Sequence, residues 1–183
     1  MPRALIIGYG NIDRADDGVA HEVVNALRRL QGRAPLSEEE TGLEALGAEV
    51  DTVFLSQLTP ELVETIRDYD RVVFVDAHVY PEADGLHCRD VGQECNPSIF
   101  THHVTPGMLL GMAKALLGHD PIAHIVSVRG HDFDFHRRLS PLTRKLAKQA
   151  VDYICRWLEE SRHADGHAKA SDAAGSGPAS RSR

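Results

Sequence analysis

Short apolar runs alternate along the chain with longer segments of helical periodicity. The runs are rich in Val, Ile and Leu, and they have the length of buried strands. They cover residues 4–7, 53–55, 71–76 and 122–128. A strand followed by a connection of helical length returns to the sheet parallel to its predecessor. The pattern predicts a single three-layer α/β/α domain over residues 1–160, with a twisted, mostly parallel sheet and a shorter edge strand at 86–91.

Helical patterns occupy the segments between these strands and after the last one. Helices are expected at residues 18–31, 59–68, 105–117 and 141–158. Thr59 and Thr105 each precede a proline, which is the usual order of an N-cap and a first helical residue. One apolar stripe is expected in the last helix. It consists of Leu142, Leu146, Val151, Ile154 and Leu158. Residues 161–183 show no such stripe, so we expect a disordered tail there.

Charge and cysteine content narrow the classes of function. The 183 residues include 20 Lys and Arg against 27 Asp and Glu, a net charge of −7, and they lack the basic stripe of nucleic-acid binders. Cys88, Cys95 and Cys155 have no CxxC spacing, which indicates free buried thiols. No segment resembles a signal peptide or a membrane span. We therefore expect a soluble, cytoplasmic protein, a monomer with no nucleic-acid or membrane partner.

The first strand leads into a glycine-rich loop, GYGNIDRADDG, over residues 8–18. A dinucleotide fingerprint needs a third glycine where Asp13 stands, and the two acids at the helix start would repel a pyrophosphate. A phosphate-binding GK[ST] sequence is also missing. Gly8 and Gly10 are therefore interpreted as residues of a tight turn. Of Asp16 and Asp17, one is expected to cap the following helix, with Asp17 at the N-cap position.

Ligands of such sheets collect beyond the carboxyl ends of the strands. Asp76 ends the buried run VVFVD, where its carboxylate needs a cation, a metal or a donor to stay ionised. His102 and His103 stand just before a predicted helix. With Asp16 or Asp17 they form an oxygen and nitrogen set suited to zinc, nickel or a related divalent ion. A second polar cluster is expected to be a solvated loop. It comprises His131, Asp132, Asp134 and His136.

Four ordered segments together resemble the maturation endopeptidases of nickel-iron hydrogenases. They are GYGNIDRADDG, the strand end VFVDA, the helix entry THHVTP with LLGMAKALLG after it, and VSVRGHDFDFHRRLSP. The resemblance covers roughly Leu5 to Leu158. It implies a single α/β domain with endopeptidase activity, a hydrolase of the aspartyl protease class. Its substrate would be the precursor of a hydrogenase large subunit, from which it removes a C-terminal peptide after nickel insertion and so activates the hydrogenase.

The resemblance also implies roles for individual residues. Three residues would contact metal: Asp17, Asp76 and His102, with His103 as the alternative histidine. The nickel would be carried by the precursor, while zinc or another divalent ion could occupy the isolated protein. Asp16 or Asp17 would act as the base in hydrolysis, unless the metal itself polarises the water. Asp17 stands where some members have Glu, which shortens its reach by one methylene group.

Two other classes of function fit the same residues. A non-proteolytic module could hold a metal or the hydrogenase subunit without cutting it. A metal-dependent hydrolase of small esters would use the same carboxylates and histidine on another substrate. Intact mass separates the first alternative from a protease, because only a protease removes a peptide, and turnover of a chromogenic ester separates the second.

Overall fold

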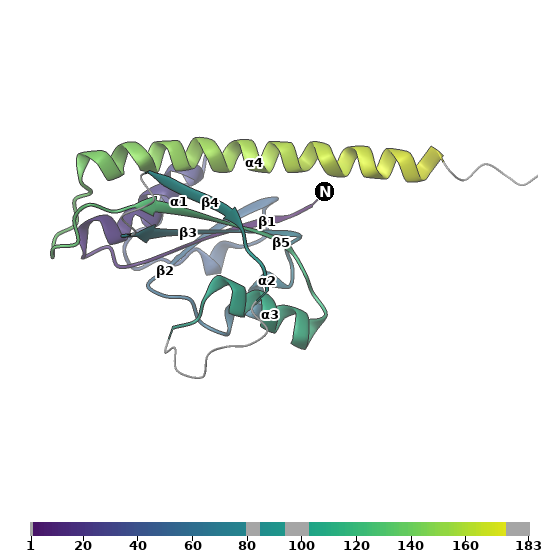
Figure 1. Ribbon diagram of the computed structural model, residues 1–183, viewed down its shortest axis with the longest axis horizontal. Coiled ribbons are helices and arrows are strands. Elements are labelled where there is room, and N and C mark those ends of the chain that lie inside the picture. The colour runs from purple at the N-terminus through teal and green to yellow at the C-terminus, as the bar shows by residue number, and fades with distance from the viewer. Residues whose placement is uncertain (1, 80–84, 94–102, 175–183) are drawn as a thin grey trace, which may run out of the picture.

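A five-stranded sheet forms the centre of the computed structural model, which describes residues 2–79, 85–93 and 103–174, with side chains up to residue 160. The strand order is β2-β1-β3-β5-β4 (Figure 1). The strands are β1 (Ala4–Tyr9), β2 (Val50–Leu55), β3 (Arg71–His78), β4 (Leu86–Asp90) and β5 (Ile122–Arg129). Neighbouring strands are parallel except for the edge pair, in which β4 runs antiparallel to β5. The predicted mostly parallel sheet and its short edge strand are confirmed.

Helices cover both faces of this sheet (Figure 1). One face carries α1 (Val19–Leu30) and α4 (Pro141–Ala174), and the other carries α2 (Leu62–Ile66) and α3 (Pro106–Leu117). Two short 3-10 turns, η1 (Ala15–Gly18) and η2 (Leu43–Ala45), precede α1 and β2. Each helical layer has its own buried apolar cluster against the sheet. The three-layer α/β/α architecture is therefore confirmed.

Strand β1 shows why the apolar runs of the sequence are continuous rather than alternating. Ile6 packs in the cluster under α1 and α4, whereas Leu5 and Ile7 pack in the cluster under α2 and α3. All three side chains are fully buried. Because both faces of the strand are covered, every position favours an apolar residue, and each buried side chain of this size stabilises the fold by about 1.5–3 kcal/mol.

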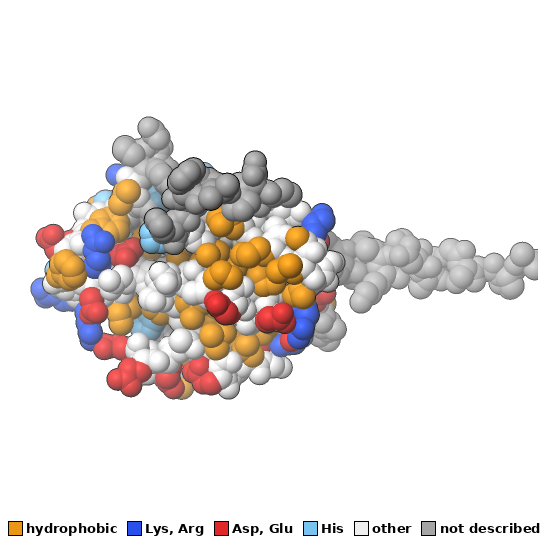
Figure 2. Space-filling model, turned by 90° about the horizontal axis from the view of Figure 1, so that it is seen from below, with side chains coloured by type: hydrophobic (Ala, Val, Ile, Leu, Met, Phe, Trp, Pro, Cys, Tyr) orange, Lys and Arg blue, Asp and Glu red, His pale blue; other side chains and the backbone are white. Residues whose placement is uncertain are grey.

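Helix α3 begins and ends where the sequence predicts. The Thr105 hydroxyl accepts a hydrogen bond from the Met108 amide at 3.2 Å, Pro106 occupies the first turn, and Gly118 ends the helix with a left-handed φ of +64°. Hydrophobic side chains gather on this face of the molecule (Figure 2). Leu116 of α3 is 73% exposed. Helix α3 thus presents apolar groups to the surface as well as to the core.

The other helices depart from the sequence prediction at their ends. Helix α2 is confined to Leu62–Ile66, after a 3-10 turn at Thr59. Helix α4 continues to Ala174, past the predicted boundary at residue 160, because the alanine-rich continuation has no proline and keeps helical backbone hydrogen bonds. Of the disordered tail predicted over residues 161–183, the part from residue 175 onward lies outside the described residues. Leu142 is 60% exposed and does not join the predicted stripe, since it lies in the first turn of α4.

The predicted capping of α1 by an aspartate is wrong. Gly18 occupies the N-cap position, and no side chain caps this helix. Asp16 and Asp17 belong instead to the preceding turn η1. Both carboxylates are therefore available for contacts other than a helix cap.

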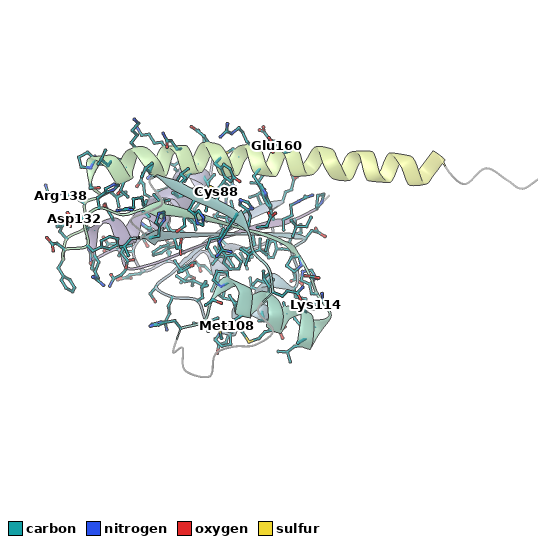
Figure 3. The ribbon with its side chains drawn as sticks, in the orientation of Figure 1. Cys88, Met108, Lys114, Asp132, Arg138 and Glu160 are labelled. Carbon is teal, nitrogen blue, oxygen red and sulfur yellow. The ribbon has the colours of Figure 1, made fainter. Side chains whose placement is uncertain are left out.

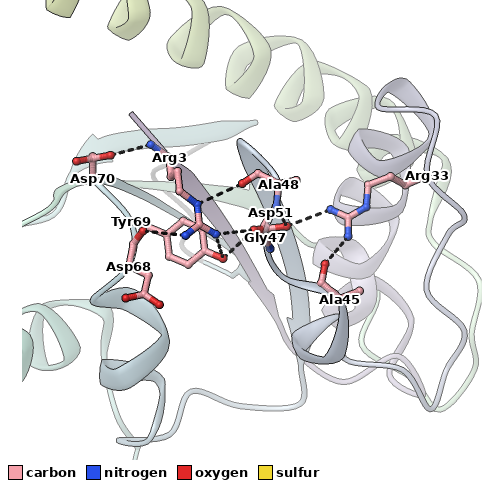
Figure 4. Close-up of polar contacts among 9 residues, drawn as sticks. All are labelled: Arg3, Arg33, Ala45, Gly47, Ala48, Asp51, Asp68, Tyr69 and Asp70. Carbon is pink, nitrogen blue, oxygen red and sulfur yellow. Dashed lines mark hydrogen bonds and ion pairs between the residues drawn. The ribbon is translucent and has the colours of Figure 1, made fainter. Parts of the chain in front are cut away.

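Asp51 forms a polar hub at the amino edge of the sheet (Figure 4). Its carboxylate is fully buried and accepts hydrogen bonds from five groups. The donors are the Arg3 and Arg33 guanidiniums, both at 3.3 Å, the Tyr69 hydroxyl at 2.8 Å and the Gly47 and Ala48 amides at 2.8 and 3.2 Å. Burial alone would raise the pKa of Asp51, but these hydrogen bonds outweigh it and lower the pKa below its ordinary value of 3.8.

Two remaining expectations concern cysteines and the membrane. Cys88 and Cys155 are free and half-buried, and Cys95 lies outside the described residues. Within the described ranges, no helix combines the length and the apolarity that a bilayer crossing requires.

Candidate functional site

The carboxyl ends of the parallel strands meet at one edge of the sheet. Asp132 and Arg138 lie at this edge, whereas Lys114 lies at the opposite one (Figure 3). Gly8 pairs with Val75 in the ladder between β1 and β3, so the next residues, Tyr9 and Asp76, come side by side. The glycine-rich loop that follows Tyr9 is thus brought next to the end of β3.

Gly10 and Gly8 serve different purposes in this loop. Gly10 has a φ of +145°, and a Cβ atom there would lie 2.2 Å from the Asp17 carbonyl oxygen, so only glycine fits. The tight turn predicted at Gly10 is confirmed. Gly8 lies within β1, where a Cβ atom would come 2.9 Å from the Val24 side chain. Its role is close packing of α1 on the sheet.

Asp17 is held at the surface of this loop. Its side chain is half-buried, and its Oδ2 accepts a hydrogen bond from the Asn11 amide at 3.0 Å. The Asp17 amide donates to the Arg14 carbonyl at 3.0 Å. These two bonds close the loop on itself.

Asp16 points the other way and is fully buried. Its carboxylate accepts five hydrogen bonds, all from the segment that leads into α4. They come from the His131 and Asp132 amides at 2.8 and 3.0 Å, the Ser140 amide and hydroxyl, both at 2.7 Å, and the Thr143 hydroxyl at 2.7 Å. Burial raises the pKa of Asp16, but these donors together lower it below 3.8. The group is therefore an ionised and fully hydrogen-bonded carboxylate.

Only one of the two carboxylate oxygens of Asp76 has a hydrogen-bond partner among the described residues. Its Oδ2 accepts a hydrogen bond from the Tyr9 hydroxyl at 3.0 Å, whereas its Oδ1 is buried and has no hydrogen-bond partner among the described residues. Burial raises the pKa of Asp76 above 3.8, despite opposing hydrogen bonds from neighbouring hydroxyls. A buried carboxylate oxygen without a partner is costly, and it is a group that a cation could satisfy.

Two histidines were candidates for the predicted metal set, and the structure describes only one of them. His102 lies outside the described residues, and His103 is exposed just before α3. Within residues 2–79, 85–93 and 103–160, no three His, Cys, Asp or Glu side chains are grouped to hold a metal ion. The metal set of Asp17, Asp76 and His102 therefore stays a prediction.

The loop at residues 131–136 is not simply solvated, which corrects the sequence prediction. The Ala15 amide donates to the His136 carbonyl at 2.6 Å, and the Asp16 amide donates to the Asp132 carbonyl at 3.0 Å. The His136 ring and the Asp132 carboxylate are 3.0 Å apart. This loop packs backbone to backbone against the loop of Asp17. Phe135 and Asp134 do remain exposed.

The surface pockets formed by the described residues lie beside this edge of the sheet. A pocket of about 130 Å³ lies next to the first loop, lined by Ile12, His21, Glu38 and Arg137 among others. Larger grooves of about 540 and 570 Å³ run along α4.

Solved structures with the same arrangement of elements are hydrogenase maturation proteases. The hydrogenase maturating endopeptidase HybD from E. coli matches with a TM-score of 0.60 and 23% identity, over 87% of this chain and 93% of its own. The [NiFe] hydrogenase maturation protease HycI from Thermococcus kodakarensis matches with a TM-score of 0.61 and 21% identity, over 86% and 93%. The hydrogenase 2 maturation peptidase from Thaumarchaeota archaeon SCGC_AB-539-E09 gives 0.55 and 22%, over 85% and 97%.

This chain has the hydrogenase maturation protease fold. No protein-family model matches it, and no curated protein matches it by sequence. The match to these three solved structures spans 93–97% of their own length. The fold expected from the four sequence segments is confirmed.

Within this maturation protease fold, the structure brings Asp17 and Asp76 to the same edge and turns Asp16 away into the interior. Sequence reasoning missed the partners of Asp16 and the hydrogen bond from Tyr9 to Asp76. The donors to Asp16 lie more than a hundred residues away in the chain, so no local spacing could indicate them. The Tyr9 contact could have been inferred, because Tyr9 ends β1 and Asp76 lies near the end of the adjacent parallel strand β3.

Proposed function

We propose that this protein is an endopeptidase that removes the C-terminal extension from the precursor of a nickel-iron hydrogenase large subunit. The observation that carries the proposal is the end-to-end likeness to HybD and HycI, over 93% of each of those chains. The polar edge adds support, because it presents the half-buried carboxylate of Asp17 and a buried oxygen of Asp76 that has no hydrogen-bond partner among the described residues. A fold can host several functions, so the residues of this edge must carry the chemistry.

Asp17 is the residue that we assign as the general base. A water molecule would add to the scissile carbonyl carbon while Asp17 accepts its proton, and that proton would then pass to the departing amine as the C–N bond breaks. Asp16 is the poorer candidate of the two predicted bases, since all its hydrogen-bonding capacity is directed to the interior.

Nickel in the precursor would be recognised by Asp17, Asp76 and His102, with His103 as the alternative. The Oδ1 atom of Asp76, which has no hydrogen-bond partner among the described residues, supports this assignment, because it offers a carboxylate oxygen at the edge. A precursor without nickel would lack the ion that these groups contact. It would therefore bind more weakly, and this difference in affinity would restrict cleavage to the nickel-loaded precursor.

Intact-mass measurement of the precursor tests this proposal. We expect the purified protein to remove one C-terminal peptide from nickel-loaded precursor and to leave nickel-free precursor at least tenfold less cleaved, which corresponds to about 1.4 kcal/mol of differential binding. Equal cleavage of both forms would contradict nickel recognition. Formation of a complex without any loss of mass would contradict the protease itself.

Single-residue substitutions test which side chain acts as the general base. Asp17→Ala is expected to lower cleavage by about 10²–10⁴-fold, the usual contribution of a general base. Asp120→Ala is the matched control, because Asp120 is exposed just before β5, at the opposite edge of the sheet. Full activity of Asp17→Ala would remove Asp17 from the mechanism.

A further inference from the structure

The contacts of Asp16 join two parts of the chain that lie far apart in sequence. Its five donors belong to two groups: the amides of residues 131 and 132, and the polar atoms of Ser140 and Thr143 around the first turn of α4. Two backbone bonds, from the Ala15 and Asp16 amides, add to the same junction. The loop of Asp17 is therefore attached to the start of the longest helix of the fold.

The chemistry of this junction favours a fixed geometry. Every donor to Asp16 is a neutral amide or hydroxyl, and the carboxylate lies at the N-terminus of α4, where the helix dipole stabilises a negative charge. Thr143 Oγ1 lies 2.7 Å from Asp16 Oδ2 and 3.0 Å from the Arg129 carbonyl oxygen. The charged Asp16 oxygen is the stronger acceptor of the two, so it receives the single hydroxyl proton of Thr143. Four donors converge on Oδ2 and one on Oδ1, an arrangement that few rotations of the side chain would preserve.

Asp17 follows Asp16 directly, so the junction determines where Asp17 stands. The backbone of Asp17 touches Gly10, and its carboxylate accepts from the Asn11 amide. Without the five contacts of the Asp16 side chain, the turn η1 would keep these local bonds on the side of β1 and the two backbone bonds to the 131–136 loop. A displacement of about 1 Å at a reacting group can lower a rate by about 10²-fold.

We propose that Asp16 is a positioning residue, and that Ser140 and Thr143 at the start of α4 act through it to hold Asp17 in its reactive place. The role in catalysis rests on the proposed function, whereas the role in ordering the loop does not. The sequence had offered Asp16 as a second candidate for the base. The structure assigns it to the support of Asp17 instead.

Hydrogen exchange of the loop amides and cleavage kinetics together test the proposal. Asp16→Asn can keep four of the five contacts if its amide oxygen takes the place of Oδ2, whereas Asp16→Ala keeps none. Thr143→Val removes a single donor and preserves shape. We expect kcat/KM to fall about tenfold in Thr143→Val and about 10²-fold in Asp16→Ala, with Asp16→Asn between them. Amides 11–17 should exchange faster in the same order.

Thr52→Val is the matched control, because Thr52 is also a buried threonine in a polar contact, with the Arg28 side chain at 3.3 Å. It should leave both readouts unchanged. A double variant, Asp16→Asn with Thr143→Val, should show a loss smaller than the product of the single losses, since the two residues share one contact.

The alternative roles give different results. If Asp16 were the base itself, Asp16→Asn would be as inactive as Asp16→Ala, and Thr143→Val would have wild-type kinetics and wild-type exchange. That outcome would overturn the proposal. If the wild-type protein cleaved no precursor, the proposed function would fail, and the exchange of amides 11–17 in Thr143→Val would still show whether the junction orders the loop.

Discussion

Asp51 and Asp16 are two fully buried carboxylates at opposite edges of one sheet. Asp51, at the amino edge, is paired with two arginines and a tyrosine (Figure 4). Asp16, at the carboxyl edge, has neutral donors only. The amino-edge hub neutralises its charge within the fold. The carboxyl-edge hub keeps its negative charge next to Asp17, where the proposed substrate brings a metal ion.

The hydrogen bonding of Asp76 shows a second difference between the two edges. At the amino edge, both oxygens of Asp51 are satisfied, whereas at the carboxyl edge Asp76 keeps one buried oxygen without a partner among the described residues. Unsatisfied buried groups are expected where a protein trades stability for function. The amino edge therefore stabilises the fold, whereas we propose that the carboxyl edge binds a ligand.

The largest expected change in stability comes from the amino edge. Asp51→Asn leaves Arg3 and Arg33 without their buried partner, and because both arginines retain some exposure, we expect a loss of about 3 kcal/mol. The corresponding fall in Tm is about 6–12 °C for a chain of this size. Thermal unfolding followed by circular dichroism would measure it. Below its unfolding temperature the variant should cleave precursor normally, and a selective loss of cleavage would break the comparison.

The pH dependence of that loss has a defined sign. The folded-state pKa of Asp51 lies below 3.8, so its stabilisation is present above that value and is lost as the pH falls through the lowered pKa. The wild-type protein and Asp51→Asn should therefore converge in Tm below about pH 4. A difference that stayed constant down to pH 2 would show that shape rather than charge is responsible.

Substitution of Asp76 is expected to change the free energy of unfolding by a smaller amount and in the opposite direction. Its pKa is raised by burial, so the ionised form destabilises the fold above that pKa and the effect disappears as the pH falls toward 3.8. Asp76→Asn should therefore raise the free energy of unfolding at neutral pH, by about 1 kcal/mol, while it abolishes nickel-dependent cleavage. Chemical denaturation at pH 7 and pH 4 would reveal it. Destabilisation at pH 7 would show that Asp76 is already satisfied without a ligand.

The smallest change is expected from Tyr9→Phe, which removes only the hydroxyl that contacts Asp76. One hydrogen bond contributes about 1 kcal/mol or less to stability, so Tm should move little. Outer partners of metal ligands typically change affinity by about tenfold or more, so Cd²⁺ or Zn²⁺ titrated into the protein should bind more weakly. Tyr153→Phe, which loses a hydroxyl bonded to His124, is the control and should keep wild-type affinity.

Local patterns predicted the fold well. Strand runs, the Thr105 cap and the Gly118 stop depend on neighbouring residues, and they appear where expected. Helix α4 runs past its predicted end, where the continuation to Ala174 has no proline to stop it. The expected cap at Asp17 failed because η1 turns this residue toward Asn11 instead.

The site was predicted only in its residue types. Asp17 and Asp76 come from strand ends, whose place in a parallel sheet follows from topology. The Asp16 junction depends on contacts across more than a hundred residues, and the same spacing of residues would suit a cap, a base or a support. Only the three-dimensional arrangement distinguishes these roles.

The most direct test compares Asp17→Asn and Asp51→Asn with the wild-type protein by intact mass of nickel-loaded large-subunit precursor, at a temperature where all three proteins are folded. The account predicts loss of the C-terminal peptide with the wild-type protein and with Asp51→Asn, and intact precursor with Asp17→Asn. Cleavage by Asp17→Asn at the wild-type rate, or uncleaved precursor with the wild-type protein, would contradict it.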